Sequence, residues 1–287
     1  MRGIKNITCN KYMSRLFLAV ICALFVVSIQ SSDARAVIDS SAGNSLRKNS
    51  SILFLTPMSQ EVEPLLKAQV VEKSHLLYPD LTIYKGKLDH HNISVGMLGI
   101  GKVNAAYAIT QYILATKPDV IILFGSAGGL HALKRGVLFA ASQTWTSDYG
   151  AQDPSGFVRW EPGVLPIGTI QPPVKKPVDA NIRNAVSSGY PKVEWVSIAT
   201  GDSFVNNTLL GQQLAREGAD LVDMESAVVA DLAARFNIPL LILRVVSDGA
   251  DDSANKSFTE SLDQVCENAI PEILSIIRTV ADDIPAA

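Results

Sequence analysis

The sequence predicts an α/β fold in which a largely parallel β-sheet is covered by helices on both faces. Segments of strand type alternate with segments of helical periodicity along most of the 287-residue chain. Two predicted strands, residues 119–124 and 239–247, are apolar almost without a break, which is typical of strands buried on both faces. Strands of this kind alternating with helices indicate a sheet enclosed between helical layers.

The first half of the predicted fold contains four strands and two helices. Short apolar runs predict the strands at residues 52–56, 83–88, 93–100 and 119–124. A polar turn at residues 90–92 is expected to join the second and third of these strands into a hairpin. Helices are predicted over residues 61–69 and 103–116, and Pro118 ends the second one. The apolar face of that second helix is predicted to consist of Ala106, Ile109, Ile113 and Leu114.

The second half continues the alternation around two loops. Small residues predict a tight loop over residues 125–130, where backbone N–H groups could bind a hydroxyl or an anionic oxygen. The segment 147–180 is rich in proline and glycine, which predicts a long functional loop crossed by short strands. The remaining predicted strands are residues 137–143, 193–200 and 239–247, and the remaining helices are residues 181–188, 203–217, 224–236 and 258–282.

The first 36 residues have the organisation of a secretory signal. Basic residues precede a 14-residue apolar run over 16–29, and Ala34-Arg-Ala36 provides a small-residue cleavage site. A membrane span needs about 20 apolar residues, so an uncleaved anchor is the lesser alternative. Residues 37–51 are rich in serine and asparagine and are predicted to be a disordered spacer, and residues 52–287 form the folded domain. We therefore expect an exported protein, either periplasmic or secreted.

Composition and motifs exclude several classes of function. The net charge of −3 and the isoelectric point near 5.8 provide no basic patch for nucleic acid. Only Cys266 follows the predicted signal, so no intramolecular disulfide can form there. The segment 96–102 matches a phosphate-loop pattern, but Val103 stands where a magnesium-binding hydroxyl is needed. Asn104 likewise replaces the third glycine of a dinucleotide-binding fingerprint.

Ionisable residues gather where an apolar strand ends. Arg244 lies inside the run 239–247, and Ser247 and Asp248 close it. A buried arginine must meet a carboxylate, a ligand or a water network. Glu225 begins an apolar helix on its core side and also needs a partner, which sugar hydroxyls could supply. Simple helix-capping roles remain open for both Glu225 and Asp248 at this point.

Six segments, in this order, resemble the methylthioadenosine/S-adenosylhomocysteine nucleosidases of the purine nucleoside phosphorylase superfamily. They are Met58-x-x-Glu61-Val, Gly99-Ile-Gly-Lys-Val103, Gly125-Ser-Ala-Gly-Gly-Leu130, Ala199-Thr-Gly-Asp-Ser-Phe204, Val222-Asp-Met-Glu-Ser-Ala227 and Arg244-Val-Val-Ser-Asp248. The resemblance covers residues 52–282. It implies a three-layer α/β sandwich with a central twisted mixed sheet, a homodimer, and no metal ion or organic cofactor.

The resemblance also implies roles for individual residues. Asp248, oriented by Ser247, would protonate N7 of a purine nucleoside, and Glu61 would activate the attacking water together with Arg244 and Ser126. Glu225 would bind the ribose hydroxyls. The other implied substrate-binding residues are Met224, Phe204, Val205, Gly129, Ile100, Met58 and Phe258.

The same resemblance favours hydrolysis over phosphorolysis. Related phosphorylases have a phosphate loop and an arginine where this chain has residues 56–59 and Phe124, and the Glu61 carboxylate would repel phosphate. Asp223 stands where many nucleosidases have glutamate, the loop 147–166 differs from the family's usual segment, and export is unexpected. A phosphorylase and a non-catalytic secreted nucleoside-binding or storage protein therefore remain alternatives. The substrate stays open among methylthioadenosine, S-adenosylhomocysteine, 5′-deoxyadenosine and adenosine.

Overall fold

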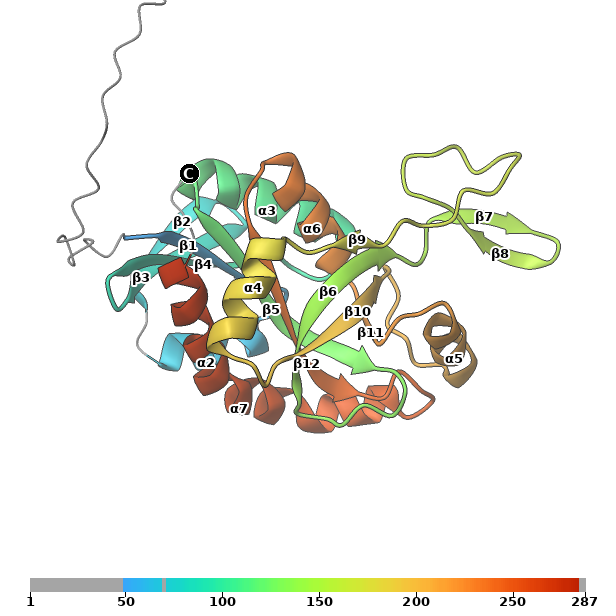
Figure 1. Cartoon of the computed structure of the whole chain (residues 1–287). Coiled ribbons are helices and arrows are strands. Elements are labelled where there is room, and N and C mark those ends of the chain that lie inside the picture. Colours follow the sequence, from blue (N-terminus) through green and yellow to red (C-terminus); the bar gives the residue numbers. More distant parts are fainter. Residues whose placement is uncertain (1–48, 69–70, 284–287) are drawn as a thin grey trace, which may run out of the picture. The chain divides into compact units, whose positions relative to one another are not determined.

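The computed structural model describes residues 49–68 and 71–283, so the predicted signal and residues 37–48 of the predicted spacer lie outside it. These residues form a ten-stranded mixed sheet with helices on both faces and a separate two-stranded sheet (Figure 1). The strand order in the large sheet is β11-β10-β6-β12-β5-β1-β4-β3-β2, and β9 pairs with β6. None of the helices described here is both long enough and apolar enough to cross a membrane.

The alternation of strands and helices predicted from the sequence is confirmed. The strands are β1 (Ser51–Thr56), β2 (Val71–Tyr78), β3 (Leu81–Leu88), β4 (His91–Met97), β5 (Val120–Gly129), β6 (Leu138–Thr146), β7 (Gly150–Asp153), β8 (Gly156–Arg159), β9 (Lys176–Pro177), β10 (Glu194–Thr200), β11 (Leu221–Asp223) and β12 (Leu240–Asp248). The helices are α2 (Ser59–Lys67), α3 (Lys102–Thr116), α4 (Ala180–Gly189), α5 (Thr208–Arg216), α6 (Ser226–Arg235) and α7 (Ala254–Asp283).

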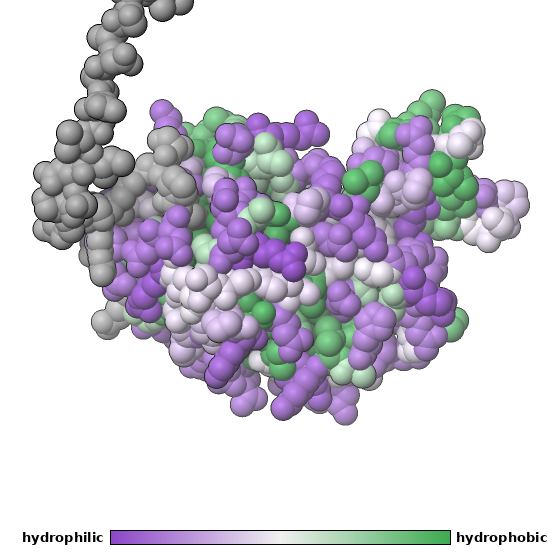
Figure 2. All heavy atoms as spheres, viewed as in Figure 1, coloured by the Kyte–Doolittle hydropathy of each residue, from purple (hydrophilic) through white to green (hydrophobic). Residues whose placement is uncertain are grey.

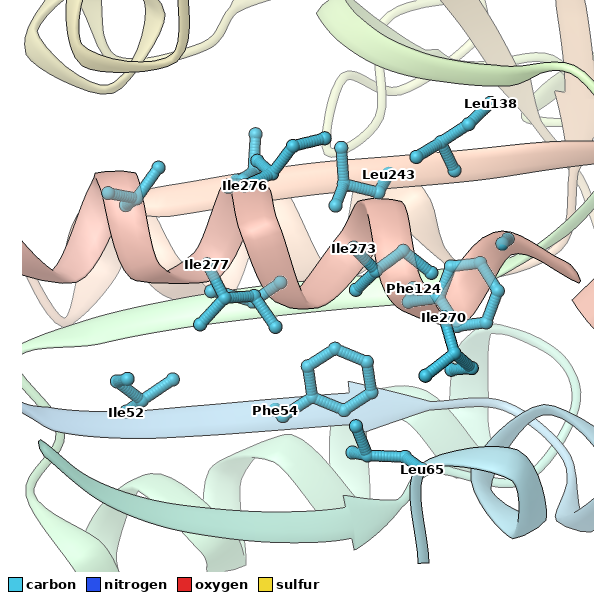
Figure 3. Packing of buried hydrophobic residues seen from close by; sticks show 14 of the residues in the cluster. Ile52, Phe54, Leu65, Phe124, Leu138, Leu243, Ile270, Ile273, Ile276 and Ile277 are labelled. Atoms are coloured by element: carbon cyan, nitrogen blue, oxygen red, sulfur yellow. The ribbon is translucent and has the colours of Figure 1, made fainter. Parts of the chain in front are cut away.

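Two cores lie on the two faces of the sheet. In β1, Ile52 and Phe54 belong to the core beneath α2, α4 and α7, whereas Leu53 and Leu55 belong to the core beneath α3 and α6. This alternation follows from the two-residue period of a strand. Figure 3 shows the isoleucines of α7 packed over Phe54. The predicted three-layer arrangement is thereby confirmed.

The prediction of a tight loop at residues 125–130 is wrong, because β5 continues through Gly129. Its first part pairs with β1 and β12, and its last two residues pair with β11. Small residues make this close packing possible. A Cβ on Gly128 would lie 2.9 Å from a methyl carbon of Val222.

Three local predictions also need correction. In α3, Leu114 is 59% exposed and Tyr112 is buried in its place, because the Tyr112 hydroxyl donates to carbonyl groups of Thr82 and Met97. The hairpin turn lies at residues 89–90, and His91 already belongs to β4. Helix α5 begins only after Asn207, whose side chain accepts a hydrogen bond from the Leu210 backbone.

The predicted long loop over residues 147–180 is confirmed, and it contains the hairpin of β7 and β8. In Figure 1 this hairpin stands apart from the main sheet, and Figure 2 shows apolar surface on the same part of the molecule. The strongly exposed apolar side chains of the segment are Leu165, Ile167, Ile170 and Val174.

Candidate active site

The site is built where neighbouring strands present polar residues at matched positions. In the pairing of β12 with β5, Arg244 lies beside Gly125 and Asp248 beside Gly128. In the pairing of β10 with β11, Thr200 lies beside Asp223. Long-range strand register therefore brings residues distant in the sequence into one crevice.

Arg244 is fully buried among carboxylates. Its Nη2 lies 2.7 Å from Oδ2 of Asp223 and 3.4 Å from Oε2 of Glu225, and both Nε and Nη2 donate to the Ser226 hydroxyl. Although burial alone would lower the pKa of Arg244, the charges of Asp223, Glu225 and Glu61 raise it. The guanidinium is therefore a permanent positive charge at the base of the site.

Glu61 is the second buried charge-bearing group. Its Oε1 accepts hydrogen bonds from the Ser126 backbone N–H at 2.7 Å and the Ser126 hydroxyl at 2.8 Å, and its Oε2 accepts from the Met58 N–H at 3.0 Å. Burial raises its pKa, and these hydrogen bonds together with Arg244 oppose the rise. A Cβ on Gly125 would lie 2.1 Å from Nη1 of Arg244 and 3.1 Å from Oε1 of Glu61, so only glycine fits between them.

Glu225 lies at the N-terminus of α6 and is 4% exposed. Its Oε1 accepts the Gly101 N–H at 3.0 Å, and its Oε2 faces Arg244. Burial raises its pKa to about 7, and the attraction of Arg244 only partly opposes that rise. A carboxyl group that changes charge near neutral pH and borders a cavity is suited to binding hydroxyl groups.

Asp248 ends β12 and is 2% exposed. Its Oδ2 accepts the Ser247 hydroxyl at 2.9 Å and its Oδ1 accepts the Ala250 N–H at 2.9 Å, which fixes the orientation of the carboxyl group. Burial raises its pKa, and these two hydrogen bonds oppose the rise. A carboxyl group that keeps its proton to higher pH than usual, in a fixed orientation, is suited to act as a general acid.

These groups border a cavity of about 330 Å³. Of the thirteen residues predicted from the sequence, ten line it: Met58, Glu61, Ile100, Ser126, Phe204, Met224, Glu225, Ser247, Asp248 and Phe258. The rings of Phe204 and Phe258 meet edge to face with centroids 5.5 Å apart. Half-exposed Ile100 and Phe204 place apolar surface at the cavity mouth, while the carboxylates lie deep.

Three predicted residues do not line the cavity. Arg244 lies behind the carboxylates that line the cavity and is not itself a lining residue. Its Nη1 makes no hydrogen bond within residues 49–68 and 71–283. Gly129 is paired with Leu221, and a Cβ there would meet Val246 rather than open space, because the segment is a strand and not a loop. The Val205 side chain packs in a separate small core beside the cavity.

Several residues that shape the site were given no role from the sequence, although they lie within the segments that carry the family resemblance. Asp223, Thr200 and Ser226 form the hydrogen-bonded setting of Arg244, and Gly101 anchors Glu225. The only available signal was the pair of carboxylates two residues apart in Asp223-Met-Glu225.

One group of side chains is spaced to hold a metal ion in the described part of the chain: His90, His91 and Asp282. None of them lines the cavity. Moreover, Nδ1 of His91 accepts the Ser50 N–H at 3.2 Å, so the neutral ring carries its proton on Nε2, the atom that faces Asp282. A ring in this form donates a hydrogen bond rather than binding a metal.

Comparison with known proteins points to one family. Residues 51–281 match the family described as the phosphorylase superfamily. The chain is 32% identical over 227 residues to a 5′-methylthioadenosine/S-adenosylhomocysteine nucleosidase of Haemophilus influenzae strain 86-028NP, a match that covers 77% of this chain and 95% of the relative. An Exiguobacterium enzyme of the same description is 29% identical, with 77% and 94% covered.

Solved structures agree with this result. A Neisseria meningitidis 5′-methylthioadenosine/S-adenosylhomocysteine nucleosidase in complex with methylthio-immucillin-A matches with a TM-score of 0.68 and 28% identity, covering 80% of this chain and 99% of that one. Futalosine hydrolase of Helicobacter pylori strain 26695 matches with a TM-score of 0.68 and 26% identity, covering 80% and 97%.

Proposed function

Because the chain belongs to the 5′-methylthioadenosine/S-adenosylhomocysteine nucleosidase family of the phosphorylase superfamily, we propose that this N-glycosyl hydrolase cleaves a 5′-substituted adenosine into adenine and the free sugar. The proposed substrates are methylthioadenosine, S-adenosylhomocysteine and 5′-deoxyadenosine. The observation that carries the proposal is that the carboxyl groups of Asp248 and Glu61, which come from different elements, line the same cavity.

Asp248 is proposed to act on the leaving group. Burial raises the pKa of Asp248, which favours the protonated form, and the Ser247 and Ala250 hydrogen bonds orient the carboxyl group. Transfer of this proton to purine N7 lets the electron pair of the C1′–N9 bond move into the base, so that neutral adenine departs. The sugar is left with the character of an oxocarbenium ion, as in other glycoside cleavages.

Glu61 is proposed to act on the nucleophile. Water held beside Glu61, the Ser126 hydroxyl and Nη1 of Arg244 would bond to C1′ while Glu61 accepts its proton. Nη1 has no hydrogen-bond partner among the residues that the structure describes. This supports the arrangement, because a buried donor without a partner is costly and a water would satisfy it.

The remaining lining residues are proposed to bind the parts of the substrate. The Glu225 carboxylate accepts hydrogen bonds from the ribose hydroxyls, with Met224 against the sugar, and the Phe204 ring stacks on adenine. The Val205 backbone is proposed to contact the adenine edge, since Val205 directly follows Phe204. The 5′ substituent then meets Met58, Ile100 and Phe258.

Hydrolysis is preferred to phosphorolysis because of the charge of the cavity. The ionisable residues that line it, Glu61, Asp223, Glu225 and Asp248, are all acidic. Those that are ionised disfavour a phosphate dianion, and the positive charge of Arg244 is already paired with Asp223. The test is to incubate purified protein with methylthioadenosine, with and without phosphate, and to identify the sugar product. Free methylthioribose in both buffers supports hydrolysis. Release only with phosphate would identify a phosphorylase, and tight adenine binding without turnover would identify a binding or storage protein.

A homodimer and export remain proposals from the sequence. Exposed apolar side chains of α3 and of the loop before β9, among them Val103 at 79% and Ile167 at 73%, support burial against a second copy. Light scattering of the purified protein tests the dimer, and a single monomeric mass would contradict it. N-terminal sequencing of the protein recovered from cells tests cleavage after residue 36.

A further inference from the structure

Asp223 is the carboxylate that binds Arg244 most closely, and its side chain is only 2% exposed. Oδ2 lies 2.7 Å from Nη2, and Oδ1 accepts the Thr200 hydroxyl at 2.6 Å. The Ser226 N–H approaches both oxygens at 3.2 and 3.3 Å. The carboxylate is thus held from β10, from α6 and from the guanidinium, and it has little freedom to move.

Three buried carboxyl groups share this one guanidinium. Asp223 has the 2.7 Å contact with Nη2, Glu225 has a longer 3.4 Å contact with the same nitrogen, and Glu61 lies on the Nη1 side across Gly125. One positive charge cannot fully neutralise three neighbouring carboxylates. The closest carboxylate therefore limits how much the guanidinium stabilises the negative charge of the other two. The distances make Asp223 the main partner and leave Glu225 incompletely paired.

We propose that Asp223 is a positioning residue that holds Nη2 of Arg244, directs Nη1 toward Glu61, and thereby leaves the Glu225 carboxylate available to the ribose hydroxyls. This inference rests on the proposed function, because it assigns Glu225 to the sugar. Without the Asp223 charge, Arg244 would move toward Glu225 and form a close ion pair with it. That ion pair would compete with the hydrogen bonds from the ribose hydroxyls to the Glu225 carboxylate.

The charge state of Glu225 is the readout that separates positioning from simple structural support. The charged groups facing Glu225 are Arg244 from β12, Asp223 from β11 and Glu61 from α2, and Asp248 lies in the same cavity. The pKa of Glu225 is raised to about 7 by burial, lowered by Arg244 and raised by Asp223. Neutralising Asp223 removes a raising influence and strengthens the lowering one, so the pKa of Glu225 must fall.

The experiment measures binding of two ligands that the protein cannot hydrolyse, adenine and the C-nucleoside formycin A, by calorimetry between pH 5 and pH 9. Their affinity ratio isolates the contribution of the sugar. In the unmodified protein the ratio should favour formycin A increasingly as the pH rises through about 7, as Glu225 ionises. In Asp223→Asn we expect this midpoint to fall by about one pH unit or more. The ratio at pH 8 should fall about ten-fold, because Glu225 then binds Arg244.

Two further variants complete the design. Asp223→Glu keeps the charge and should restore the wild-type midpoint. Thr200→Val removes the hydroxyl bound to Asp223 but changes no charge, so it should lower the unfolding temperature and keep the midpoint. If Asp223→Asn does not fold, Asp223→Ser, which leaves room for water beside Arg244, replaces it.

An unchanged ratio and midpoint in the neutral Asp223 variant would overturn the inference while leaving the proposed function intact. A shifted midpoint in Thr200→Val, or no rescue by Asp223→Glu, would also overturn it, since charge would then not be the cause. Binding of neither ligand by the unmodified protein would overturn the proposed function and this inference together.

Discussion

Replacing Glu225 with glutamine should stabilise the protein relative to the wild type, and this gain should be larger at alkaline pH than at acidic pH. The carboxyl group ionises near its ordinary pKa of 4.5 in the unfolded chain, but its pKa is raised to about 7 in the fold. The folded state therefore holds the proton more tightly. The resulting stability is fully present below pH 4.5 and is lost as the pH rises through about 7. Glutamine has nearly the same shape and does not titrate.

The size of this effect on the free energy of unfolding follows from the shift in the pKa of Glu225. At about 1.4 kcal/mol per pKa unit, ionisation of Glu225 costs the fold about 3 kcal/mol at high pH, and about 2 kcal/mol of this develops between pH 5.5 and pH 8. For a domain of this size we expect Glu225→Gln to gain about 4–8 °C in unfolding temperature relative to wild type over that interval.

Thermal unfolding followed by circular dichroism at the two pH values measures this difference. Glu260→Gln is the matched control, because it makes the same change in a carboxylate that is 62% exposed beside Lys256. For this control, the difference in unfolding temperature between variant and wild type should be nearly the same at pH 5.5 and pH 8. A Glu225→Gln difference that is equal at pH 5.5 and pH 8 would refute the account of Glu225 as a buried group that charges near neutral pH.

Three further predictions concern groups that touch the site. Gly125→Ala should destabilise the protein by about 1–3 kcal/mol in thermal unfolding, because the new Cβ would lie 2.1 Å from Nη1 of Arg244; wild-type stability would contradict this. Gly101→Ala, at a backbone φ of +88°, should disturb the N–H bound to Glu225 and raise KM about ten-fold in steady-state assays; an unchanged KM counts against it. Ser247→Ala removes a hydrogen bond that lowers the pKa of Asp248, so the alkaline limb of the pH profile of kcat should move to higher pH. A move to lower pH would contradict this role of Ser247.

The sheet and its two helical layers could be predicted because burial on both faces is visible in local sequence. Residues 239–247 are apolar at nearly every position, and β12 indeed has every residue buried. Such a run needs no knowledge of its neighbours. The same holds for Arg244 and Asp248, which stand out as charges within or directly after an apolar strand.

Features that depend on pairing between distant segments were not visible. The segment 125–130 has the composition of a turn, and only its pairing with β12 and β11 makes it a strand and moves Gly129 away from the cavity. The three-residue strand β11 is too short to show a period, yet its register beside β10 places Asp223 next to Thr200. β2 contains a run of four polar residues, Glu72 to His75, and forms an edge of the sheet, so it lacks the continuous apolar pattern that marks the central strands.

The measurement that tests the central claim most directly is adenine release from methylthioadenosine in phosphate-free buffer by the wild-type protein, Asp248→Asn and Glu61→Gln. We expect steady release by the wild type and a loss of about 100-fold or more in each variant, because each removes one proton transfer. Adenine binding measured in parallel should persist in Glu61→Gln, which leaves the groups proposed to contact the base in place. Release that survives both substitutions, or that requires phosphate in the wild type, would contradict hydrolysis by this pair of carboxyl groups.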